Sequence, residues 1–187
     1  VAVKVIDKFA VQRLGDLKQV WRAIRRVDRE VAVLRRFRHP HIVGFLDVRH
    51  GPDAVYLVME YAEKDLYSVI SQCAPLGVPT DEAQRVMKQL GSAVAHLHGH
   101  DICHLDLKPE NVLLAGPSAT VKLCDFGVAA SCANGTRLTD FVGSCGFFAP
   151  ELVLQNGYLQ NGYDGRFADA WSFGVVLLEL LIGSEKF

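Results

Sequence analysis

The hydrophobic pattern of the first third of the chain predicts strands arranged around one long helix. Residues 1–6 have the composition and alternation of a strand. Between residues 17 and 37 the apolar side chains recur at helical spacing, and arginines occupy much of the remaining surface, so we expect an amphipathic helix that ends before Pro40. The apolar stretches 42–48 and 54–62 flank a Gly-Pro turn and predict an antiparallel strand pair.

Helical periodicity dominates the rest of the chain. The further elements that we expect are helices at 65–72, 80–99 and 169–182, and a hairpin formed by strands at 112–114 and 121–124. Thr80 is the expected N-cap of its helix, followed by an acidic first turn. The helix at 169–182 is apolar almost all round, as a helix enclosed by protein would be. Residues 128–148 lack periodicity, and loops of that length are usually functional.

Composition narrows the range of partners. With 187 residues, 50% of them hydrophobic and 22% charged, the chain can bury a core and is expected to be soluble. The net charge of −1 provides no overall field for nucleic acid or an anionic membrane, so neither is expected as a partner. The longest apolar stretch, 173–183, contains Glu179 and is too short and too polar to cross a bilayer.

Cysteine and histidine spacing gives no sign of a metal or disulfide framework. The five cysteines are an odd number without a C-x-x-C pair, which favours a reducing compartment. We therefore expect a cytoplasmic protein, with the nucleus as the alternative. Histidines 96, 98, 100 and 104 lie at a predicted helix end and in a loop. We interpret them as solvated or core residues, because histidines in such positions are rarely metal ligands.

Two segments rich in polar and charged residues that could take part in catalysis lie on either side of the predicted hairpin. The run His104-Leu105-Asp106-Leu107-Lys108-Pro109-Glu110-Asn111 precedes it, and Asp125-Phe126-Gly127 follows it. An antiparallel pair returns the chain to its starting end, so Asn111 and Asp125 should lie together. Their side-chain oxygens suit Mg²⁺, and Asp106 can accept a proton from a hydroxyl. The two segments therefore indicate phosphoryl transfer.

These segments resemble motifs of the eukaryotic protein kinase family, and the resemblance covers essentially the whole chain. Val1-Ala2-Val3-Lys4 is similar to the family's lysine-bearing strand, and Glu30 to its helix partner. Ala149-Pro150-Glu151 is similar to the end of the activation segment, and Asp169-Ala170-Trp171-Ser172-Phe173-Gly174 to the start of the central helix. Each match alone is weak, but all of them occur in the family's order and on the expected element types.

The resemblance implies an α+β, two-lobed fold. Residues 1–62 would form a small antiparallel-sheet lobe with one helix, ending at a hinge, and residues 63–187 a larger, mainly helical lobe. It also implies transfer of the γ-phosphate of ATP, with Mg²⁺, to serine or threonine of protein substrates, because the loop at 106–111 has the serine/threonine form. Residues 2–8 and 163–165 look most like the calmodulin-dependent and AMP-activated-kinase-related group. The sequence does not identify a regulatory partner.

The same resemblance implies a role for each matching residue. Lys4 would hold phosphates of ATP, with Glu30 fixing its long side chain. The implied catalytic residues are Asp106, Lys108 and Asn111, and the implied metal ligands are Asn111 and Asp125. Residues of the hinge and of the adenine and ribose contacts would be Ala2, Met59, Glu60, Ala62, Asp65 and Leu113. Plain core packing also explains Met59 and Leu113, and Glu30 could instead pair only with arginines of its own helix.

Three departures from the family pattern affect the interpretation. Leu105 replaces the arginine that grips an activation-segment phosphate, so we expect activity to depend little on phosphorylation there. Ser144-Cys145 replaces the usual threonine-proline, which leaves substrate choice unclear, and the repeated pentamer at 155–164 looks like an insertion. The chain begins at the family's third strand and ends soon after the central helix. We therefore expect a fragment without the glycine-rich loop and the C-terminal helices, with exposed apolar faces on the helix at 175–181.

Two alternatives remain open from the residues. A pseudokinase or scaffold, or an inactive kinase fragment, would use the fold for binding, with the arginine-rich helix as its contact surface. The presence of Lys4, Asp106, Asn111 and Asp125 favours catalysis instead. Cys124, next to Asp125, is either a reactive thiol in the site or, more commonly, an inert small hydrophobe.

Overall fold

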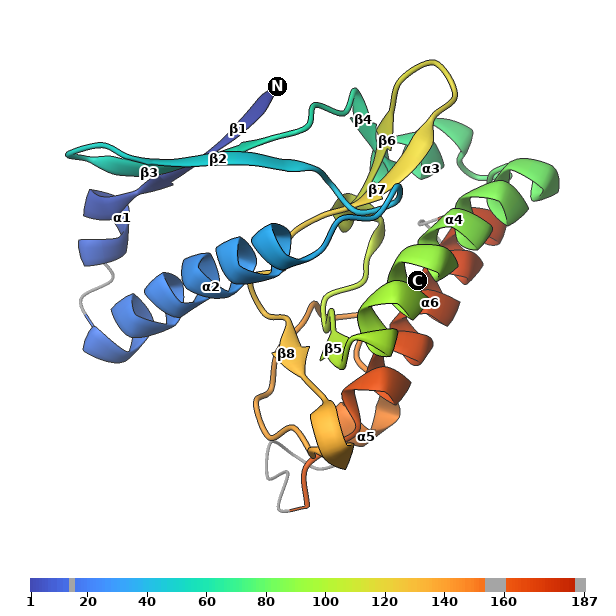
Figure 1. Cartoon of the computed structure of the whole chain (residues 1–187). Coiled ribbons are helices and arrows are strands. Elements are labelled where there is room, and N and C mark those ends of the chain that lie inside the picture. The colour runs from blue at the N-terminus through green and yellow to red at the C-terminus, as the bar shows by residue number, and fades with distance from the viewer. Residues whose placement is uncertain (14–15, 154–160, 184–187) are drawn as a thin grey trace.

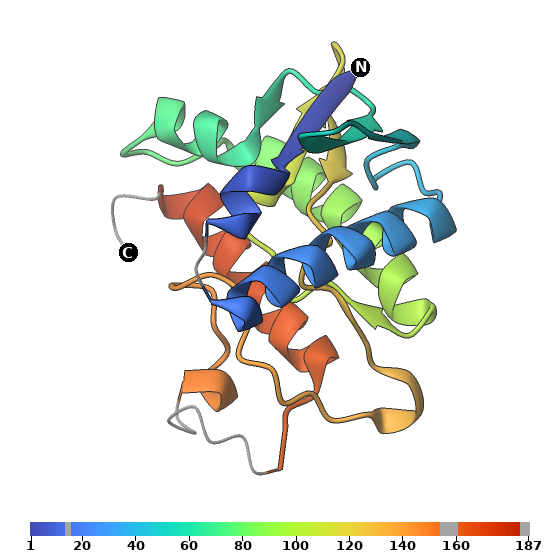
Figure 2. The same cartoon turned by 90° about the vertical axis from the view of Figure 1, so that its left-hand side faces the viewer.

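A small antiparallel sheet with two helices forms the first part of the protein (Figure 1). The structure is a computed structural model, and it describes residues 1–13, 16–153 and 161–183. The sheet has the order β1-β3-β2. Its elements are β1 (Ala2–Asp7), α1 (Lys8–Gln12), α2 (Leu17–Arg36), β2 (Phe45–His50) and β3 (Ala54–Met59). Figures 1 and 2 show α2 lying along one side of this sheet.

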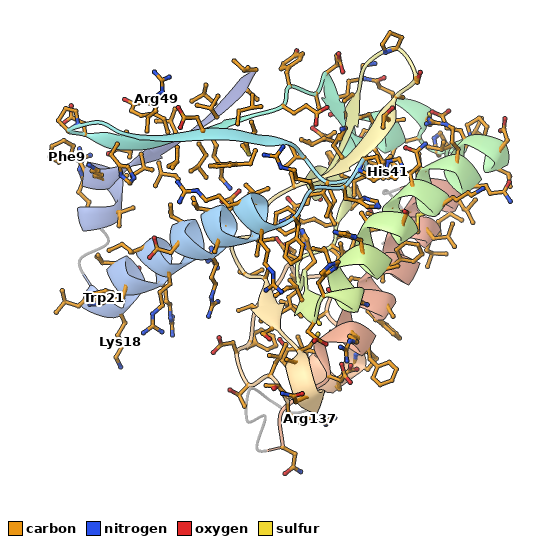
Figure 3. All side chains as sticks on the ribbon, viewed as in Figure 1. Phe9, Lys18, Trp21, His41, Arg49 and Arg137 are labelled. Carbon is orange, nitrogen blue, oxygen red and sulfur yellow. The ribbon has the colours of Figure 1, made fainter. Side chains whose placement is uncertain are left out.

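The long helix α2 has the predicted extent and clear physical limits. The Asp16 side chain accepts a hydrogen bond from the Lys18 backbone N–H and caps the first turn. The helix ends at Arg36, since Phe37 is extended and Pro40 follows. Its buried side chains are Glu30, Val33 and Leu34, while Lys18 and Trp21 extend outward at its N-terminal end (Figure 3). The helix therefore presents one carboxylate among apolar groups toward the interior.

The second part of the protein is mainly helical. It contains β4 (Lys64–Asp65), α3 (Leu66–Cys73), α4 (Thr80–Gly99), β5 (Ile102–Cys103), β6 (Val112–Ala115), β7 (Thr120–Leu123), β8 (Ala130–Ser131), α5 (Pro150–Val153) and α6 (Gly165–Ile182). Single 3-10 turns lie at Pro109–Asn111 and Ala133–Gly135. Figure 1 shows α4 and α6 side by side, with the β6–β7 hairpin at one end of α4. The expected α+β fold with a small sheet and a larger helical part is confirmed.

Two apolar clusters hold these elements. The larger joins α2, α3, α4, the β6–β7 hairpin and α6 through fully buried side chains such as Leu90, Leu107 and Phe126. The smaller surrounds Leu105 and Tyr163 beneath the segment that follows β8. Burial of each large apolar side chain stabilises the fold by about 1.5–3 kcal/mol relative to exposure. The site residues described below lie on loops between elements that these clusters fix.

Several local expectations differ from the structure. The first strand of the predicted pair at 42–48 begins only at Phe45, because Ile42 instead bridges to Leu123 of β7. The small sheet carries a second helix, α1, which the sequence analysis missed. Thr80 is not an N-cap: Pro79 occupies that position and no side chain caps the helix, although the acidic first turn is present.

The helix α6 was expected to be enclosed, and in the described chain it is not. Phe167, Trp171 and Leu178 are 71%, 47% and 43% exposed, which agrees with the exposed apolar faces anticipated for this helix. None of the helices in the described ranges is both long enough and apolar enough to span a membrane. Most of the repeated pentamer at 155–164 lies outside the described residues.

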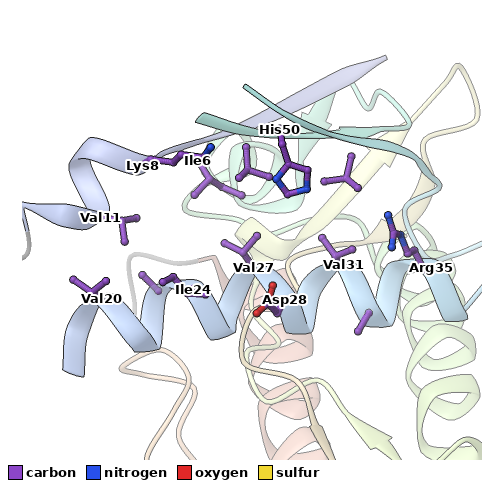
Figure 4. A pocket seen from close by; sticks show the side chains of 14 residues that line it. Ile6, Lys8, Val11, Val20, Ile24, Val27, Asp28, Val31, Arg35 and His50 are labelled. Carbon is purple, nitrogen blue, oxygen red and sulfur yellow. The ribbon is translucent and has the colours of Figure 1, made fainter. Parts of the chain in front are cut away.

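A large cavity lies between α2 and the sheet, and its lining contains no residue of the phosphoryl-transfer motifs (Figure 4). Its volume is about 680 Å³, and apolar side chains such as Ile24, Val27 and Val31 of α2 line most of it. Polar groups reach it at the edges, from Lys8, Asp28, Arg35 and His50. None of the predicted site residues lines this cavity.

Candidate active site

One lysine links the sheet, α2 and the loop after β7. The Lys4 ammonium lies 2.8 Å from each oxygen of the Glu30 carboxylate and 3.2 Å from Oδ1 of Asp125. Lys4 projects from β1 on the inward face of the strand, Glu30 from the middle of α2, and Asp125 follows β7. The structure therefore brings together three predicted residues that are far apart in the sequence. The alternative in which Glu30 pairs only with arginines of α2 is not what the geometry shows.

The shared lysine sets the charge state of this cluster. Burial opposes the charge on Lys4, but Glu30 and Asp125 outweigh it and raise the pKa of the ammonium. Burial raises the pKa of the Glu30 carboxyl, Lys4 offsets this only in part, and the neighbouring Asp125 charge raises it further. Burial acts in the same direction on Asp125, yet the attraction of Lys4 prevails and lowers the pKa of that carboxyl. Asp125 is thus the anion that persists most readily on acidification.

A second polar group surrounds Asp106. The Ser144 hydroxyl donates to Oδ1 of Asp106 at 2.7 Å, and Lys108 Nζ donates to Ser144 Oγ at 2.7 Å. Lys108 Nζ also lies 3.3 Å from Oδ2 of Asp106. The Asn111 amide donates to the backbone carbonyl of Asp106 at 2.8 Å and to its Oδ2 at 3.1 Å. The three predicted catalytic residues therefore meet, and Ser144 bridges two of them.

A buried carboxylate on α6 holds the backbone that presents Asp106. Asp169 is 0% exposed and accepts hydrogen bonds from the backbone N–H groups of His104 (2.8 Å) and Leu105 (2.7 Å). His98 Nε2 lies 2.8 Å from the same carboxylate. These bonds support Leu105 in the left-handed region, at φ 66°. The Cys103 thiol comes within 4.8 Å of the His98 and Asp169 atoms, but this grouping already serves the loop and needs no ion.

Removing the Asp169 carboxylate should destabilise the fold. In Asp169→Leu the two N–H donors of His104 and Leu105 would be left without acceptors in a dry environment. We expect the free energy of unfolding to fall by about 2–6 kcal/mol, from roughly 1–3 kcal/mol for each of the two unsatisfied donors. Urea denaturation monitored by circular dichroism measures this. The control is Asp53→Leu, at an exposed aspartate, which should change stability by less than about 0.5 kcal/mol. Asp164 is not used as the control because its side chain caps α6. Equal losses of stability in Asp169→Leu and Asp53→Leu would contradict the role given to Asp169.

The predicted hinge residues follow β3 as expected from their spacing. Met59 ends β3 and pairs with Ala2 of β1, which places these two predicted nucleotide contacts next to each other. The Glu60 backbone N–H donates to Gly44 O at 2.8 Å, and its carboxylate binds Lys122 at 2.9 Å. The Glu60 side chain therefore anchors the start of the hinge to β7, which the sequence did not indicate. Ala62 is half-buried in the segment that leads to β4.

Two further predicted nucleotide contacts are paired directly. Asp65 of β4 lies opposite Leu113 of β6 in an antiparallel register. The Asp65 carboxylate caps α3 by accepting from the Ser68 N–H at 2.7 Å. This capping role occupies one carboxylate oxygen and was not anticipated, because Asp65 was predicted to be the first residue of the helix, although an aspartate at a helix start is the usual signal for a cap.

Leu105 lies in an apolar environment. It is 8% exposed and belongs to the smaller cluster, together with Val128 and Leu152. Near it, Arg29 of α2 lies 3.8 Å from the Asp140 carboxylate in the segment between β8 and α5. Because both partners are exposed, this pair contributes at most about 1 kcal/mol. Position 105, where the kinase pattern described above has an arginine, is therefore part of the apolar core in this chain.

Cys124 fits the inert alternative. Its thiol lies 3.4 Å from the backbone carbonyl of Asn111, to which it can donate. Burial is the main cause that raises the pKa of Cys124 to about 12. The thiolate is the nucleophilic form of cysteine, so this side chain is unreactive near neutral pH.

Comparison with known proteins agrees with this arrangement. Residues 1–187, the whole chain, match the protein kinase domain family. The chain belongs to the protein kinase family. It is 38% identical over 187 residues to the carbon catabolite-derepressing protein kinase of Candida tropicalis and 39% identical over 191 residues to CBL-interacting protein kinase 4 of Oryza sativa subsp. japonica. It is also 38% identical over 179 residues to serine/threonine-protein kinase 36 of Pongo abelii.

All three relatives are named as protein kinases, and one of them as a serine/threonine-protein kinase. The three alignments cover 100%, 100% and 95% of this chain. They cover only 28%, 39% and 13% of the relatives, so the chain spans well under half of their length. Membership of the family is thus established for the chain, and ATP and Mg²⁺ use is general in that family.

The sequence analysis missed mainly the supports of this kinase site. Asp169 was recognised as part of the central-helix motif, but nothing near it in the sequence indicates that it binds the backbone at His104 and Leu105. His98 likewise carries no local signal of its contact with Asp169. Such partners are revealed only when the helices α4 and α6 are packed together.

Proposed function

We propose that this protein is an ATP-dependent serine/threonine kinase that phosphorylates protein substrates. The single observation that carries the proposal is the convergence of Lys4, Glu30 and Asp125 at 2.8–3.2 Å, beside a loop in which Asp106, Lys108 and Asn111 are bonded to one another. A fold used only for binding has no need of both groups in working geometry. The pseudokinase alternative therefore has no observation in its favour.

In the proposed mechanism Asp106 orients and deprotonates the acceptor hydroxyl. Ser144 and Asn111 hold opposite oxygens of its carboxylate, which fixes the plane of the group. A base positioned in this way typically contributes 10²–10⁴-fold to a rate. Lys108 lies beside the same carboxylate and provides positive charge where the transferred phosphoryl group gains negative charge.

The residues present fit a magnesium site. The Asn111 amide nitrogen is directed at Asp106, which leaves its side-chain oxygen as the group available to a cation. Asp125 contributes a carboxylate. Burial alone would raise its pKa, but Lys4 outweighs burial and lowers the pKa, so the carboxylate is ionised at neutral pH. Hard oxygen ligands of this type suit Mg²⁺. When bound, Mg²⁺ supplies neutralisation of phosphate charge.

Lys4 is proposed to bind phosphate oxygens of ATP. Glu30 is 3% exposed and holds the ammonium at both oxygens, so the flexible lysine side chain is oriented before the nucleotide binds. Ala2, Met59, Glu60, Ala62, Asp65 and Leu113 are proposed to complete the nucleotide site. The substrates are proposed to be proteins with serine or threonine acceptors, as in the relatives named serine/threonine-protein kinase.

Phosphate transfer from labelled ATP to a mixed peptide library tests the proposal. The protein should phosphorylate serine- or threonine-containing peptides in the presence of Mg²⁺ and not in excess EDTA. Label on tyrosine peptides alone would contradict the serine/threonine assignment. Nucleotide binding without any transfer to a library of sufficient diversity would favour the pseudokinase.

Activity should depend little on phosphorylation of the segment that follows Asp125. Leu105 offers no charge for a phosphate on Ser131, Thr136 or Thr139, so such a group would order the segment only weakly. We expect phosphatase treatment to change kcat/KM by less than about threefold, an energy of under 1 kcal/mol. Mass spectrometry confirms that phosphate has been removed. A large loss that is restored by rephosphorylation at these residues would contradict the expectation.

A further inference from the structure

Four histidines from two parts of the chain gather at the C-terminal end of α4. His39 and His41 lie in the loop after α2, and His96 and His100 lie in the last turn and at the C-cap of α4. The His39 and His96 rings stack at a centroid distance of 4.8 Å, and the His96 and His100 rings lie 4.5 Å apart. His41, labelled in Figure 3, lies where this loop meets β7, with its Nδ1 3.2 Å from the Val121 carbonyl oxygen. None of these side chains takes part in the proposed phosphoryl transfer.

The hydrogen bonds fix which ring nitrogens can bind a ligand. His100 Nδ1 lies 2.8 Å from the His96 carbonyl oxygen, and a carbonyl only accepts. His100 therefore carries its proton on Nδ1 and keeps a lone pair on Nε2. His39 is arranged differently, because its Nδ1 accepts from the His41 backbone N–H at 3.1 Å and its Nε2 faces the Ser92 hydroxyl at 3.2 Å. His39 thus packs against the α4 pair without offering it a lone pair.

The position of the α4 pair favours a cation. Residues four apart lie on one face of a helix, so His96 and His100 project side by side. The backbone carbonyls at a helix C-terminus carry partial negative charge. Phe37 contacts both rings edge-on, at 5.9 Å and 5.3 Å, and limits their rotation.

We propose that His96 and His100 form a binding site for a divalent transition metal ion of the Zn²⁺, Ni²⁺ or Cu²⁺ type. Imidazole nitrogen suits these ions, and the bond from His100 Nδ1–H to a backbone carbonyl is the kind of support that metal-bound histidines have in proteins. Water would fill the remaining coordination positions. The Arg36 guanidinium, 5.0 Å from the Phe37 ring centroid, adds nearby positive charge and favours exchangeable over permanent binding.

Calorimetric titration with Ni²⁺ in excess Mg²⁺ tests this site. Mg²⁺ occupies oxygen-ligand sites, so the remaining Ni²⁺ binding reports on imidazole and thiolate ligands. We expect one Ni²⁺ per chain, and His100→Gln should weaken its binding at least about tenfold. The histidine pair is brought together only in the folded helix α4, so Ni²⁺ should raise Tm by about 5–10 °C when its free concentration is about 100-fold above Kd.

A matched control keeps the number of histidines and changes their spacing. In Lys88→His with His100→Gln, the new histidine lies on the exposed face of α4, too far along the helix from His96 to share an ion. We expect this variant to bind Ni²⁺ as weakly as His100→Gln alone. His50→Gln, on the distant strand β2, should keep wild-type affinity. Thermal unfolding without metal shows that each variant is folded.

Two results would overturn the proposal. Wild-type affinity in His100→Gln or in the Lys88→His with His100→Gln variant would place the metal elsewhere. Absence of a Ni²⁺-dependent rise in Tm for the wild-type protein would show that the pair does not chelate. Phosphotransfer assays are not needed for either result, so the outcome is independent of the proposed kinase activity.

Discussion

Asp106→Asn is expected to lower kcat for phosphate transfer by about 10²–10⁴-fold while leaving nucleotide affinity nearly unchanged. Asparagine retains the shape of the side chain and can still be held by Ser144. It cannot accept the proton of the substrate hydroxyl. The side-chain partners of Asp106 are Ser144, Lys108 and Asn111, and not Lys4, which is proposed to bind ATP, so the loss should appear mainly in kcat. Steady-state kinetics with a peptide substrate, and ATP binding by calorimetry, measure the two quantities separately.

Two further variants make this result specific. Asp53→Asn alters an exposed aspartate in the turn between β2 and β3 and should leave kcat unchanged. Ser144→Ala keeps the base but removes the hydroxyl that bridges it to Lys108, so we expect an intermediate loss of about tenfold. A wild-type kcat in Asp106→Asn, measured on protein free of other kinases, would remove Asp106 from the mechanism.

Lys4→Met is expected to have the second largest effect, through both activity and stability. The substitution removes the cation between Glu30 and Asp125 and the proposed phosphate contact. We expect kcat/KM to fall by about 10²–10³-fold. The free energy of unfolding should fall by about 1–2 kcal/mol. This is less than the 3–5 kcal/mol typical of a fully buried pair, because the Lys4 side chain is 39% exposed.

A double variant separates these two effects. In Lys4→Met with Glu30→Met, no carboxylate remains stranded in the interior of α2, where Glu30 is 3% exposed. Replacing both members of a buried ion pair by apolar groups is often neutral for stability. The double variant should therefore regain stability near the wild type and remain as inactive as Lys4→Met. Recovery of activity along with stability would mean that Lys4 acts only in folding. Lys18→Met, on the exposed end of α2, is the control for loss of a lysine.

The sequence predicted elements whose signals are local. The strand at residues 1–6, the helix from Leu17 and the hairpin at 112–124 agree with the structure within about three residues, because alternation, helical spacing and turn residues act over short distances. The two-residue strands β4 and β8 exist only through pairing with β6 and β5, so no local pattern indicates them. Ile42 likewise pairs with Leu123 and not with the small sheet, and this partner is distant in the sequence.

For the candidate site, motif spacing was sufficient to predict the residues proposed to contact the reactants. It was insufficient to predict the residues that position them. Lys4, Glu30 and Asp125 could be matched to a known pattern and do converge. The capping bond of Asp65 is local, so the sequence held a signal for it that was overlooked. The Glu60–Lys122 pair and the two backbone bonds to Asp169 could not be foreseen, since each depends on how separate elements come together. The histidine pair of α4 is a similar case. Its spacing was visible, but its fixed tautomer was not.

The backbone bond from Leu105 to Asp169 has an evolutionary consequence. The main chain of this residue is anchored from α6, whatever side chain it carries. Selection can therefore exchange a charged side chain for an aliphatic one at this position without displacing the neighbouring Asp106. The response of this loop to phosphorylation, which depends on the side chain at position 105, can therefore change in evolution while the position of Asp106 stays the same.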